Sequence, residues 1–316
     1  MLLHDNLNFL LKMKTFTSGN IILGNEYAQD VRNNVKVQAE ALQKRNIIPC
    51  LVVILVGENP ASKIYVANKK KFAIECGMKS FDIILPEATT QSNLIAEIAK
   101  FNNDPFVHGI LVQMPLPKHI NANAVINAIN PRKDVDGFHI QNMGQLFTNT
   151  TNENSLLPCT PKGCMCILES LEQNLRGKNA VIIGSSNIVG KPMAAMLLNK
   201  GATVSVLNSA TKNKEFFTKN ADIIVLACGV PNILKGEDIS NPIILDVGIN
   251  RLSDGKIVGD CDFESCQPKA RFITTVPKGI GPMTIAMLLQ NTVTACIVQN
   301  LTAQTFATQT LTAQNL

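Results

Sequence analysis

The sequence contains no tryptophan and two tyrosines, so a tyrosine inside a chemically informative segment carries extra weight. Charge is also sparse: charged residues make up 17% of the 316-residue chain, and the formal net charge is +5. Apart from Lys69-Lys70-Lys71 there is no dense basic run, which makes nucleic-acid binding a poor explanation of its function. With 46% hydrophobic residues, the chain can fill the cores of roughly two ordinary domains.

The nine cysteines are odd in number and form no CxxC pair. Several stand beside apolar residues, as in the segment 226–228 (LAC). This distribution indicates reduced, mostly buried thiols in a cytoplasmic protein. A zinc site at Cys159, Cys164 and Cys166 is the alternative, but the ligand spacing typical of zinc is missing, so we expect no metal.

Neither a signal peptide nor a membrane span is expected. The N-terminal segment (MLLHDNLNFLLKMKTF) lacks a basic leader and is interrupted by Asp5, Asn6 and Asn8. No stretch approaches the ~20 apolar residues that a membrane span requires. Met13 is an alternative start of the chain.

Short apolar, β-branched runs alternate with helical patterns, which is typical of an α/β protein with parallel strands. The expected strands lie at 51–57, 81–85, 109–113, 180–183, 203–207, 223–227 and 243–247. The expected helices lie at 26–45, 60–76, 91–101, 191–200, 212–220 and 283–299. A polar, loop-like stretch at 148–155 (TNTTNENS) divides the chain close to Ser155, and the uncharged Thr/Ala/Gln-rich tail is expected to be frayed or disordered.

The segment 178–192 (KNAVIIGSSNIVGKP) predicts a dinucleotide site, because it reads as strand, tight turn and helix. Gly184 lets the chain turn sharply, and Gly190 permits close packing of the helix on the strand. The N-terminus of the helix then offers N–H groups and the positive end of its dipole to a phosphate. An ordinary turn with structural glycines is the alternative, since the spacing is not the usual GxGxxG.

The loop after the strand at 203–207 bears on the choice of cofactor. An acidic residue there would hold the ribose hydroxyls of NAD. The chain instead runs through Asn208 and Ser209 to Lys212. A hydroxyl and a nearby cation favour a ribose phosphate, hence NADP, although a loop that tolerates either cofactor remains the alternative.

The helix at 60–76 has clear ends, with Asn59 placed to cap it, Pro60 at its first position and Gly77 just beyond. On this helix Tyr65 and Lys69 share a face, because they are four residues apart.

Ser62 stands three residues before Tyr65, whereas Lys70 and Lys71 are rotated away. A run of three lysines on a helix is more often a solvated face, so this composition alone does not make Lys69 catalytic.

Other polar residues are placed where they could reach a ligand. Gln113 ends an apolar strand before a proline-rich stretch. Asp134 and Asp136, in DVDG, face one way if that segment is extended, and a polar turn is the alternative. The Pro/Gly-rich stretch 274–284 (TTVPKGIGPMT) could line a cleft before the last helix.

In this order, the segments resemble the bifunctional methylenetetrahydrofolate dehydrogenase/methenyltetrahydrofolate cyclohydrolase family. The resemblance covers roughly residues 50–296, and its stretches are VGENPASKIYVANKKKFAIECGM, GILVQMPLP, PRKDVDGFH, PCTPKG, VIIGSSNIVGKPM, ADIIVLACGVPNIL, ILDVGIN and VPKGIGPMT. Any one of them alone is weak, but their joint order is highly specific.

The resemblance implies a role for each matching residue. Lys69 would be the central catalytic residue, supported by Gln113. Tyr65 would stack on the folate, Asp136 would bind its pterin ring, and Ser62 would line the same pocket. The cofactor-contacting positions implied in the second half, counting Gly190 of the same turn, are Gly184, Ser185, Ser186, Gly190, Ser209 and Ile249.

The resemblance also implies a fold and a reaction. Two α/β domains would flank a cleft: a folate-binding catalytic domain of residues 1–155 and 283–316, and an NADP-binding domain of Rossmann type, with a doubly wound parallel sheet, at 156–282. The enzyme would oxidise methylene-tetrahydrofolate with NADP and hydrolyse the product to formyl-tetrahydrofolate. As the resemblance implies, this one-carbon chemistry would serve purine, histidine and methionine biosynthesis. A homodimer is expected, with no nucleic-acid or membrane partner.

The sequence departs from the family pattern at several positions. Thr275 stands where proline is usual, and Lys278 where glycine is usual; Lys278 puts the geometry of the cleft in question, because it places a side chain where the family has bare backbone. Asn208 replaces a frequent histidine and Ser185 a frequent arginine, which weakens the preference for NADP.

Three alternatives stay open. They are a monofunctional dehydrogenase of the same family, another two-domain Rossmann enzyme that reduces a small carbonyl acid, and a non-catalytic nucleotide-binding regulator. The second has no reason to carry Ser62, Tyr65 and Lys69 together with DVDG, and the third would be expected to lose Lys69 or Asp136.

Overall fold

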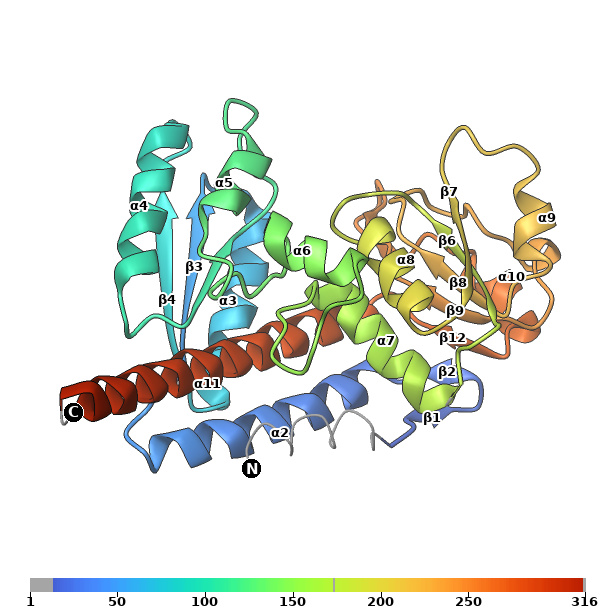
Figure 1. The fold of residues 1–316 in the computed structure, drawn as a ribbon. Helices are drawn as coiled ribbons and strands as arrows, with labels where there is room; N and C mark the ends of the chain where they lie inside the picture. Colours follow the sequence, from blue (N-terminus) through green and yellow to red (C-terminus); the bar gives the residue numbers. More distant parts are fainter. Residues whose placement is uncertain (1–13, 173, 315–316) are drawn as a thin grey trace.

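The computed structural model describes residues 14–172 and 174–314, which form two α/β lobes joined along one side by long helices (Figure 1). Met13 and the rest of the N-terminal segment, on which the expectations about a leader and an alternative start depend, lie outside the described residues.

The first lobe is built on a parallel three-stranded sheet in the order β4-β3-β5. Its central strand is buried along its whole length, which explains the unbroken apolar run CLVVILV. One face of the sheet packs against α4 and α5, and the other against α2 and α11. The elements of this lobe are β3 (Cys50–Val56), α3 (Pro60–Glu75), β4 (Lys79–Leu85), α4 (Gln91–Asn103), β5 (Gly109–Val112) and α5 (Ala122–Ala128).

The second lobe contains a seven-stranded sheet in the order β1-β2-β12-β9-β8-β6-β7, parallel except for the β1–β2 pair. Its strands are β1 (Thr17–Ser18), β2 (Ile21–Ile22), β6 (Asn179–Ile183), β7 (Thr203–Leu207), β8 (Ile223–Leu226), β9 (Ile243–Asp246) and β12 (Phe272–Thr274). Its helices are α8 (Gly190–Asn199), α9 (Lys214–Thr218), η1 (Gly236–Asp238), α10 (Phe263–Cys266) and η2 (Gln267–Lys269), and a hairpin joins β10 (Asn250–Arg251) to β11 (Ile257–Val258).

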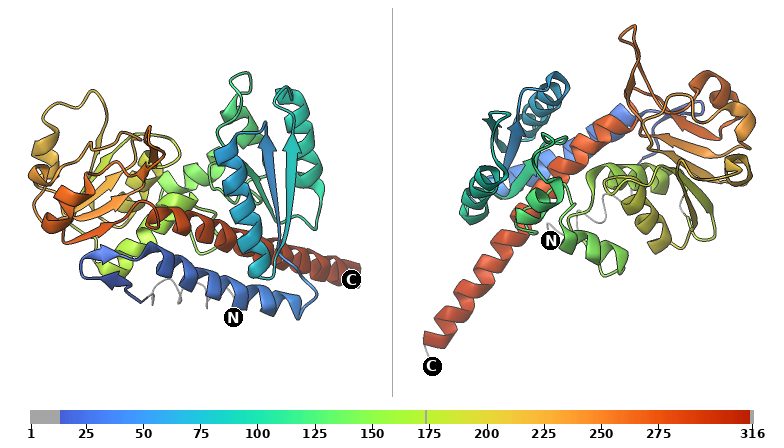
Figure 2. Two further views of the ribbon diagram at one scale, coloured as in Figure 1. Left: turned by 180° about the vertical axis from the view of Figure 1, so that it is seen from behind. Right: turned by 90° about the horizontal axis from the view of Figure 1, so that it is seen from above.

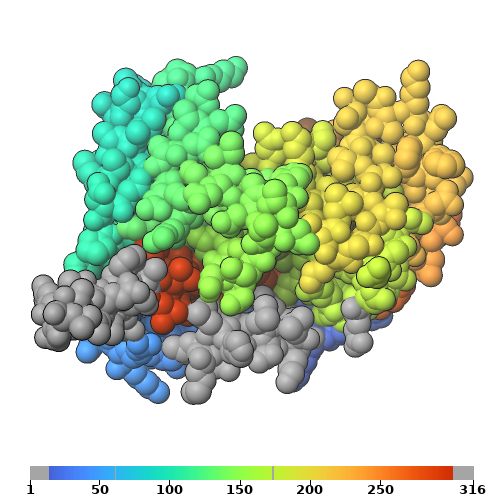
Figure 3. Space-filling view, in the orientation of Figure 1, coloured from blue at the N-terminus to red at the C-terminus, as the bar shows by residue number. Residues whose placement is uncertain are grey.

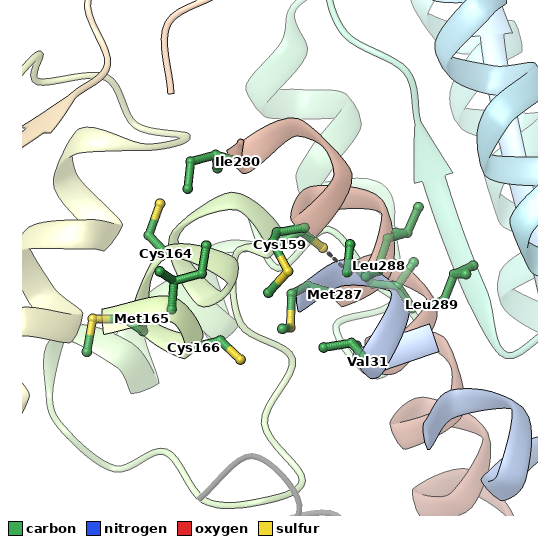
Figure 4. Close-up of a cluster of buried hydrophobic side chains, with 14 of the residues drawn as sticks. Val31, Cys159, Cys164, Met165, Cys166, Ile280, Met287, Leu288 and Leu289 are labelled. Carbon is green, nitrogen blue, oxygen red and sulfur yellow. Dashed lines mark hydrogen bonds between the residues drawn. The ribbon is translucent and has the colours of Figure 1, made fainter. Parts of the chain in front are cut away.

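Four further helices connect the lobes: α2 (Gly24–Gln43), α6 (Ile140–Phe147), α7 (Cys159–Leu171) and α11 (Ile280–Gln314). Helices α2 and α11 lie side by side beneath the first lobe and reach the second lobe at one end, and α7 packs against α11 (Figures 1 and 2). Figure 4 shows the buried cluster at this crossing, where Cys159 and Cys166 of α7 lie near Met287 of α11 and Val31 of α2. Above these helices the surface is indented between the lobes (Figure 3).

The expected fold class of two α/β units, the second with a doubly wound parallel sheet, is confirmed. The expected strands lie within two residues of the observed ones. The helix expected at 212–220 is shorter, and the helices α5, α6 and α7 and the strand β12 were not expected.

Both ends of the chain differ from expectation. Residues 17–22 pair with the sheet of the second lobe, because β2 runs parallel to β12, although the sequence placed them with the first. The tail, expected to be frayed or disordered, is helical, since α11 continues to Gln314. The remaining division into domains stays a prediction.

Within the described residues, one helical segment, Ile280–Leu301, is long and apolar enough to cross a membrane. The expectation that no stretch approaches this length was therefore too strict. Because 83% of its most apolar window is buried inside the protein, the segment is a core helix rather than a clear membrane span.

Candidate active site

Helix α3 presents the candidate catalytic face, and its ends are those predicted from the sequence. The side chain of Asn59 accepts a hydrogen bond from the backbone N–H of Ser62 at 3.1 Å, and Pro60 occupies the first turn. Ser62 is buried, whereas Tyr65 keeps 38% of its surface exposed and is free to meet a ligand.

The three consecutive lysines of α3 occupy three different environments. Lys69 is 8% exposed, Lys70 forms an ion pair with Asp82 of β4 at 3.1 Å, and Lys71 is exposed beside Glu75. The run is therefore not a uniform solvated face. Burial of Lys69 supports the sequence-based choice of this lysine over its two neighbours.

Gln113 lies at the carboxyl end of β5 and contacts Lys69 directly. The Nζ atom of Lys69 donates a hydrogen bond to Oε1 of Gln113 at 2.8 Å. The amide Nε2 of Gln113 in turn donates to the carbonyl of Met114 at 2.7 Å, which fixes the oxygen toward the lysine. A neutral amide at this position supports the amine without adding a charge that would raise its pKa.

The segment DVDG forms a turn rather than an extended strand, so its two acids do not share a role. Asp134 is buried and accepts hydrogen bonds from the backbone of Gly137 and His139 and from the side chain of Asn142, at 3.2, 2.7 and 2.9 Å. It thereby holds the turn that presents Asp136. Of the two conformations that the sequence left open, the segment adopts the polar turn and not the extended one.

Asp136 and Lys69 influence each other's charge. Burial lowers the pKa of Lys69, and the carboxylate of Asp136 opposes this shift. Burial raises the pKa of Asp136 to about 6, with Lys69 acting in the opposite direction. Burial therefore shifts the pKa of both groups in the direction that favours their neutral forms, as is typical of residues that transfer protons.

The site lies where the two lobes meet. A Cβ on Gly137 would stand 2.4 Å from the carbonyl carbon of Leu157, so the turn abuts the segment that leads into α7. The thiol of Cys159, the first residue of α7, donates to the carbonyl of Val135 at 3.2 Å. A substrate beside Lys69 and Asp136 would consequently also lie near the start of α7, which connects the lobes.

The second lobe carries the expected dinucleotide turn between β6 and α8. Gly184 has a φ of +123°, and a Cβ there would lie 2.2 Å from the carbonyl oxygen of Ala227. A Cβ on Gly190 would lie 2.0 Å from the carbonyl oxygen of Gly184. Both positions require glycine, because a neighbouring backbone carbonyl occupies the space that a Cβ would need. Such a close turn fits the approach of a dinucleotide phosphate.

Part of the N-terminus of α8 is already capped. The hydroxyl oxygen of Ser186 accepts from the N–H groups of Val189 and Gly190 at 3.2 and 3.4 Å, so these are not free for a phosphate as the sequence suggested. Ser185 and Ser186 are exposed, and the Ser186 hydroxyl still has its own proton to donate outward. These residues fit a phosphate through hydroxyl groups as well as through the helix.

Two more cofactor candidates occupy loops at the same edge of the sheet. Ser209 follows β7 and is exposed, in a loop whose Asn208 N–H donates to Thr211 at 2.9 Å. Ile249 follows β9, and 51% of its apolar side chain is exposed. An apolar side chain presented at the carboxyl edge of a parallel sheet is well placed to pack against a ligand ring.

The alternative zinc site finds no support in the geometry. Cys159, Cys164 and Cys166 are buried along α7 as free thiols, and Cys228 is the exposed one among the nine cysteines. Among the described residues, no group of three or more His, Cys, Asp or Glu side chains is placed to hold a metal ion.

Comparison with known families identifies both halves of the chain. Residues 22–136 match the catalytic domain of tetrahydrofolate dehydrogenase/cyclohydrolase, and residues 158–300 match the NAD(P)-binding domain of the same enzymes. The chain belongs to this family. A curated relative, the bifunctional protein FolD of a Wolbachia strain from Drosophila simulans, is 48% identical over 90% of this chain and 98% of its own length.

Solved structures of the dehydrogenase/cyclohydrolase family agree with this assignment. The bifunctional FolD enzyme from Campylobacter jejuni is 49% identical, with a TM-score of 0.85 over 87% of this chain and 98% of its own. The Trypanosoma brucei enzyme, complexed with NADP and an inhibitor, is 34% identical, with a TM-score of 0.84 over 89% and 98% of the two chains. The predicted family is thus confirmed.

Lys278, the main departure from the family pattern, is exposed and has a φ of +81°, a conformation that glycine adopts without strain. We expect Lys278→Gly to raise the free energy of unfolding by about 0.5–1 kcal/mol, because the left-handed strain of roughly 1–2 kcal/mol exceeds the entropy cost of glycine. Denaturant unfolding measures this. Lys278→Ala is the matched control: it keeps the Cβ and should give no gain.

The same variant tests whether this side chain shapes the substrate site. Since it points to solvent, the KM for folate should change little. A KM shift of about tenfold, or about 1.4 kcal/mol, would contradict this orientation.

Proposed function

We propose that this chain oxidises methylene-tetrahydrofolate to methenyl-tetrahydrofolate with NADP and then hydrolyses the product to formyl-tetrahydrofolate. The observation that carries the proposal is the contact of buried Lys69 with Gln113, next to Asp136, in a chain with a complete dinucleotide turn. The relatives described above are bifunctional enzymes, which supports both activities.

In the oxidation step, bound NADP supplies the hydride acceptor. The protein's own residues provide position: Tyr65 offers a half-exposed ring on the same helical face as Lys69, and Asp136 offers a carboxylate to the polar edge of the pterin ring. The glycine turn, Ser185, Ser186 and Ser209 would hold the cofactor's phosphates and ribose, while Ile249 would pack against it.

In the hydrolysis step, a water molecule must be activated next to the methenyl cation. Lys69 can accept a proton from that water once its amine is neutral, and burial already shifts its pKa in that direction. The positive charge of the bound methenyl group shifts it further. Gln113 keeps the amine oriented whether or not it is protonated, because both forms of the amine can donate to the Oε1 atom.

Purified protein with methylene-tetrahydrofolate tests both activities, followed by the absorbance of the reduced cofactor and of methenyl-tetrahydrofolate. We expect reduced NADP first and formyl-tetrahydrofolate as the end product. Accumulation of methenyl-tetrahydrofolate would instead favour a monofunctional dehydrogenase. Parallel kcat/KM values with NAD test the preference for NADP, which the absence of an acid after β7 favours; equal values would reject it.

We further propose a cytoplasmic homodimer, in which a second copy covers the open edge of β4. This strand pairs with β3 alone among the described strands, and Phe81 and Ile84 on it are 52% and 56% exposed. The hydroxyl of Ser80 and one carboxylate oxygen of Asp82 are also buried without a hydrogen-bond partner. An open strand edge with exposed apolar side chains is suited to pair with its own copy.

Replacing both Phe81 and Ile84 by lysine should raise the dimer dissociation constant about a hundredfold or more, since two apolar side chains lose burial and like charges face each other. Sedimentation equilibrium gives this constant. Phe216→Lys, which changes an exposed phenylalanine on α9, is the control and should leave it unchanged. A double variant that dimerises as tightly as the wild type would exclude this edge.

A further inference from the structure

Two buried carboxylates stand behind the loops of the second lobe and are not used in the chemistry described above. Asp246 ends β9, and Asp260 follows β11; they are 3% and 0% exposed. Neither forms an ion pair with a cation within the described residues. Their hydrogen-bond partners are instead neutral groups of the surrounding loops, so their placement reflects the loops that they hold.

Asp260 connects two of these loops. Its Oδ2 atom accepts hydrogen bonds from the backbone N–H groups of Cys228 and Gly229, at 2.8 and 3.0 Å, and from the Cys228 thiol at 3.4 Å. Its Oδ1 atom accepts from the side chain of Asn250 at 2.9 Å. One carboxylate therefore fixes the loop after β8 and the residue that follows Ile249.

Asp246 fixes the position of Asp260 and of Gly248, the residue before Ile249. Its Oδ1 atom accepts from the backbone N–H groups of Gly248 and Asp260, at 3.1 and 3.0 Å, and its Oδ2 atom from that of Cys261 at 2.9 Å. Gly248 packs so closely against Asp260 that no side chain fits there: a Cβ on Gly248 would lie 2.1 Å from the carboxylate of Asp260.

These loops border the dinucleotide crevice. Strand β6 has β7 on one side and β8 on the other, and parallel sheets bind their ligands where the strand order reverses in this way. The close approach of Gly184 to the carbonyl of Ala227 brings the phosphate turn against the loop after β8. Ser209, after β7, is placed to meet the adenosine ribose of a bound dinucleotide, so the loops after β8 and β9 would face its nicotinamide half.

We propose that Asp260 is a positioning residue for the dehydrogenase reaction: it holds Cys228, Gly229 and Ile249 in the conformation that receives the nicotinamide half of NADP. This inference rests on the proposed function. A carboxylate suits the position because its two oxygens accept from four donors at once. An asparagine would present an amide group to donors on one side and would release at least one loop.

The test is Asp260→Asn, a change of nearly constant volume. NADP affinity is measured by titration calorimetry, alongside the KM values for NADP and folate. We expect the Kd and the KM for NADP to rise about tenfold, equivalent to about 1.4 kcal/mol, with little change in the KM for folate. The matched control is Asp254→Asn in the exposed turn between β10 and β11, which makes the same change of charge and should bind NADP like the wild type.

Hydrolysis of added methenyl-tetrahydrofolate separates positioning from folding, because that step needs no NADP. A variant that loses NADP affinity but still hydrolyses this substrate supports the proposal. Unchanged NADP affinity would overturn it, as would an equal loss of both activities with a lower unfolding midpoint, since that pattern indicates a merely structural role. If the wild type does not oxidise methylene-tetrahydrofolate, the proposed function fails, while the calorimetric Kd still tests the role of Asp260.

Discussion

Lys69→Met is expected to abolish hydrolysis of methenyl-tetrahydrofolate and to leave its formation measurable. Methionine retains most of the length of the lysine side chain and removes the amine that contacts Gln113. The loss of hydrolysis should be at least the 10²–10⁴ typical of general acid–base catalysis. Hydride transfer depends on position and cofactor, so methenyl-tetrahydrofolate should accumulate in place of the formyl product, which absorbance measures directly.

The lysine run supplies its own control for this experiment. Lys71→Met makes the same substitution two residues away, on an exposed part of α3, and both activities should stay near the wild-type values. Loss of both activities in Lys69→Met would signal misfolding, which thermal unfolding would reveal. If Lys69→Met hydrolyses methenyl-tetrahydrofolate at the wild-type rate, the catalytic role of this lysine is wrong.

A second consequence concerns Asp136, which the loss of Lys69 also affects. Lys69 lowers the pKa of this buried carboxyl, which burial has raised to about 6. Without the cation the pKa should rise further, so less of the carboxylate is ionised at neutral pH. Residual dehydrogenase activity in the variant should therefore increase toward higher pH if ionised Asp136 binds the pterin ring.

The parts of the fold that follow from local patterns could be predicted from the sequence. Strands β3 and β8 read as short apolar runs because both of their faces are buried. Strands β1 and β2 could not be predicted, since two-residue strands have no periodicity and exist through pairing with β12. The helical tail was missed because its Thr/Ala/Gln composition offers no amphipathic pattern.

In the candidate site too, some features could be predicted from the sequence and others could not. The face of α3 follows from helical spacing and an N-cap, both of which are local. The roles of Asp134 and Asp260 could not be read locally, because they depend on hydrogen bonds that form after the chain has folded. The sequence does contain one signal of the turn that Asp134 holds: a glycine, Gly137, follows it by three residues, and glycine is typical of a turn. In the structure Gly137 has a φ of +79°.

Substitution of the glycines at the dinucleotide turn should have the second-largest effect. Gly184→Ala adds a Cβ at a φ of +123° and places it 2.2 Å from the carbonyl of Ala227. The substitution therefore combines backbone strain with a steric clash, and two other glycines allow these two effects to be measured separately. Gly190 meets a backbone atom at 2.0 Å without a left-handed φ, whereas Gly177 has a φ of +76° with nothing within 4 Å.

The expected loss of stability differs between backbone strain and steric clash. Gly177→Ala should lower the free energy of unfolding by about 1–2 kcal/mol, since it adds backbone strain alone. Gly184→Ala and Gly190→Ala should each cost more than about 3 kcal/mol or displace the turn, because backbone atoms cannot move aside as a flexible side chain can. Denaturant unfolding measures these costs, and calorimetry measures NADP binding.

Binding distinguishes a cofactor turn from an ordinary turn with structural glycines. Because Gly184 and Gly190 set the approach of β6, α8 and the loop after β8, their alanine variants should bind NADP at least about tenfold more weakly. Gly177→Ala should bind it normally, since this residue lies before β6, at the opposite end of the strand from the turn. If Gly184→Ala or Gly190→Ala folds and binds NADP with wild-type affinity, the turn is merely structural and the cofactor lies elsewhere. If Gly177→Ala weakens binding equally, the loss reflects general destabilisation of the lobe rather than the geometry of the turn.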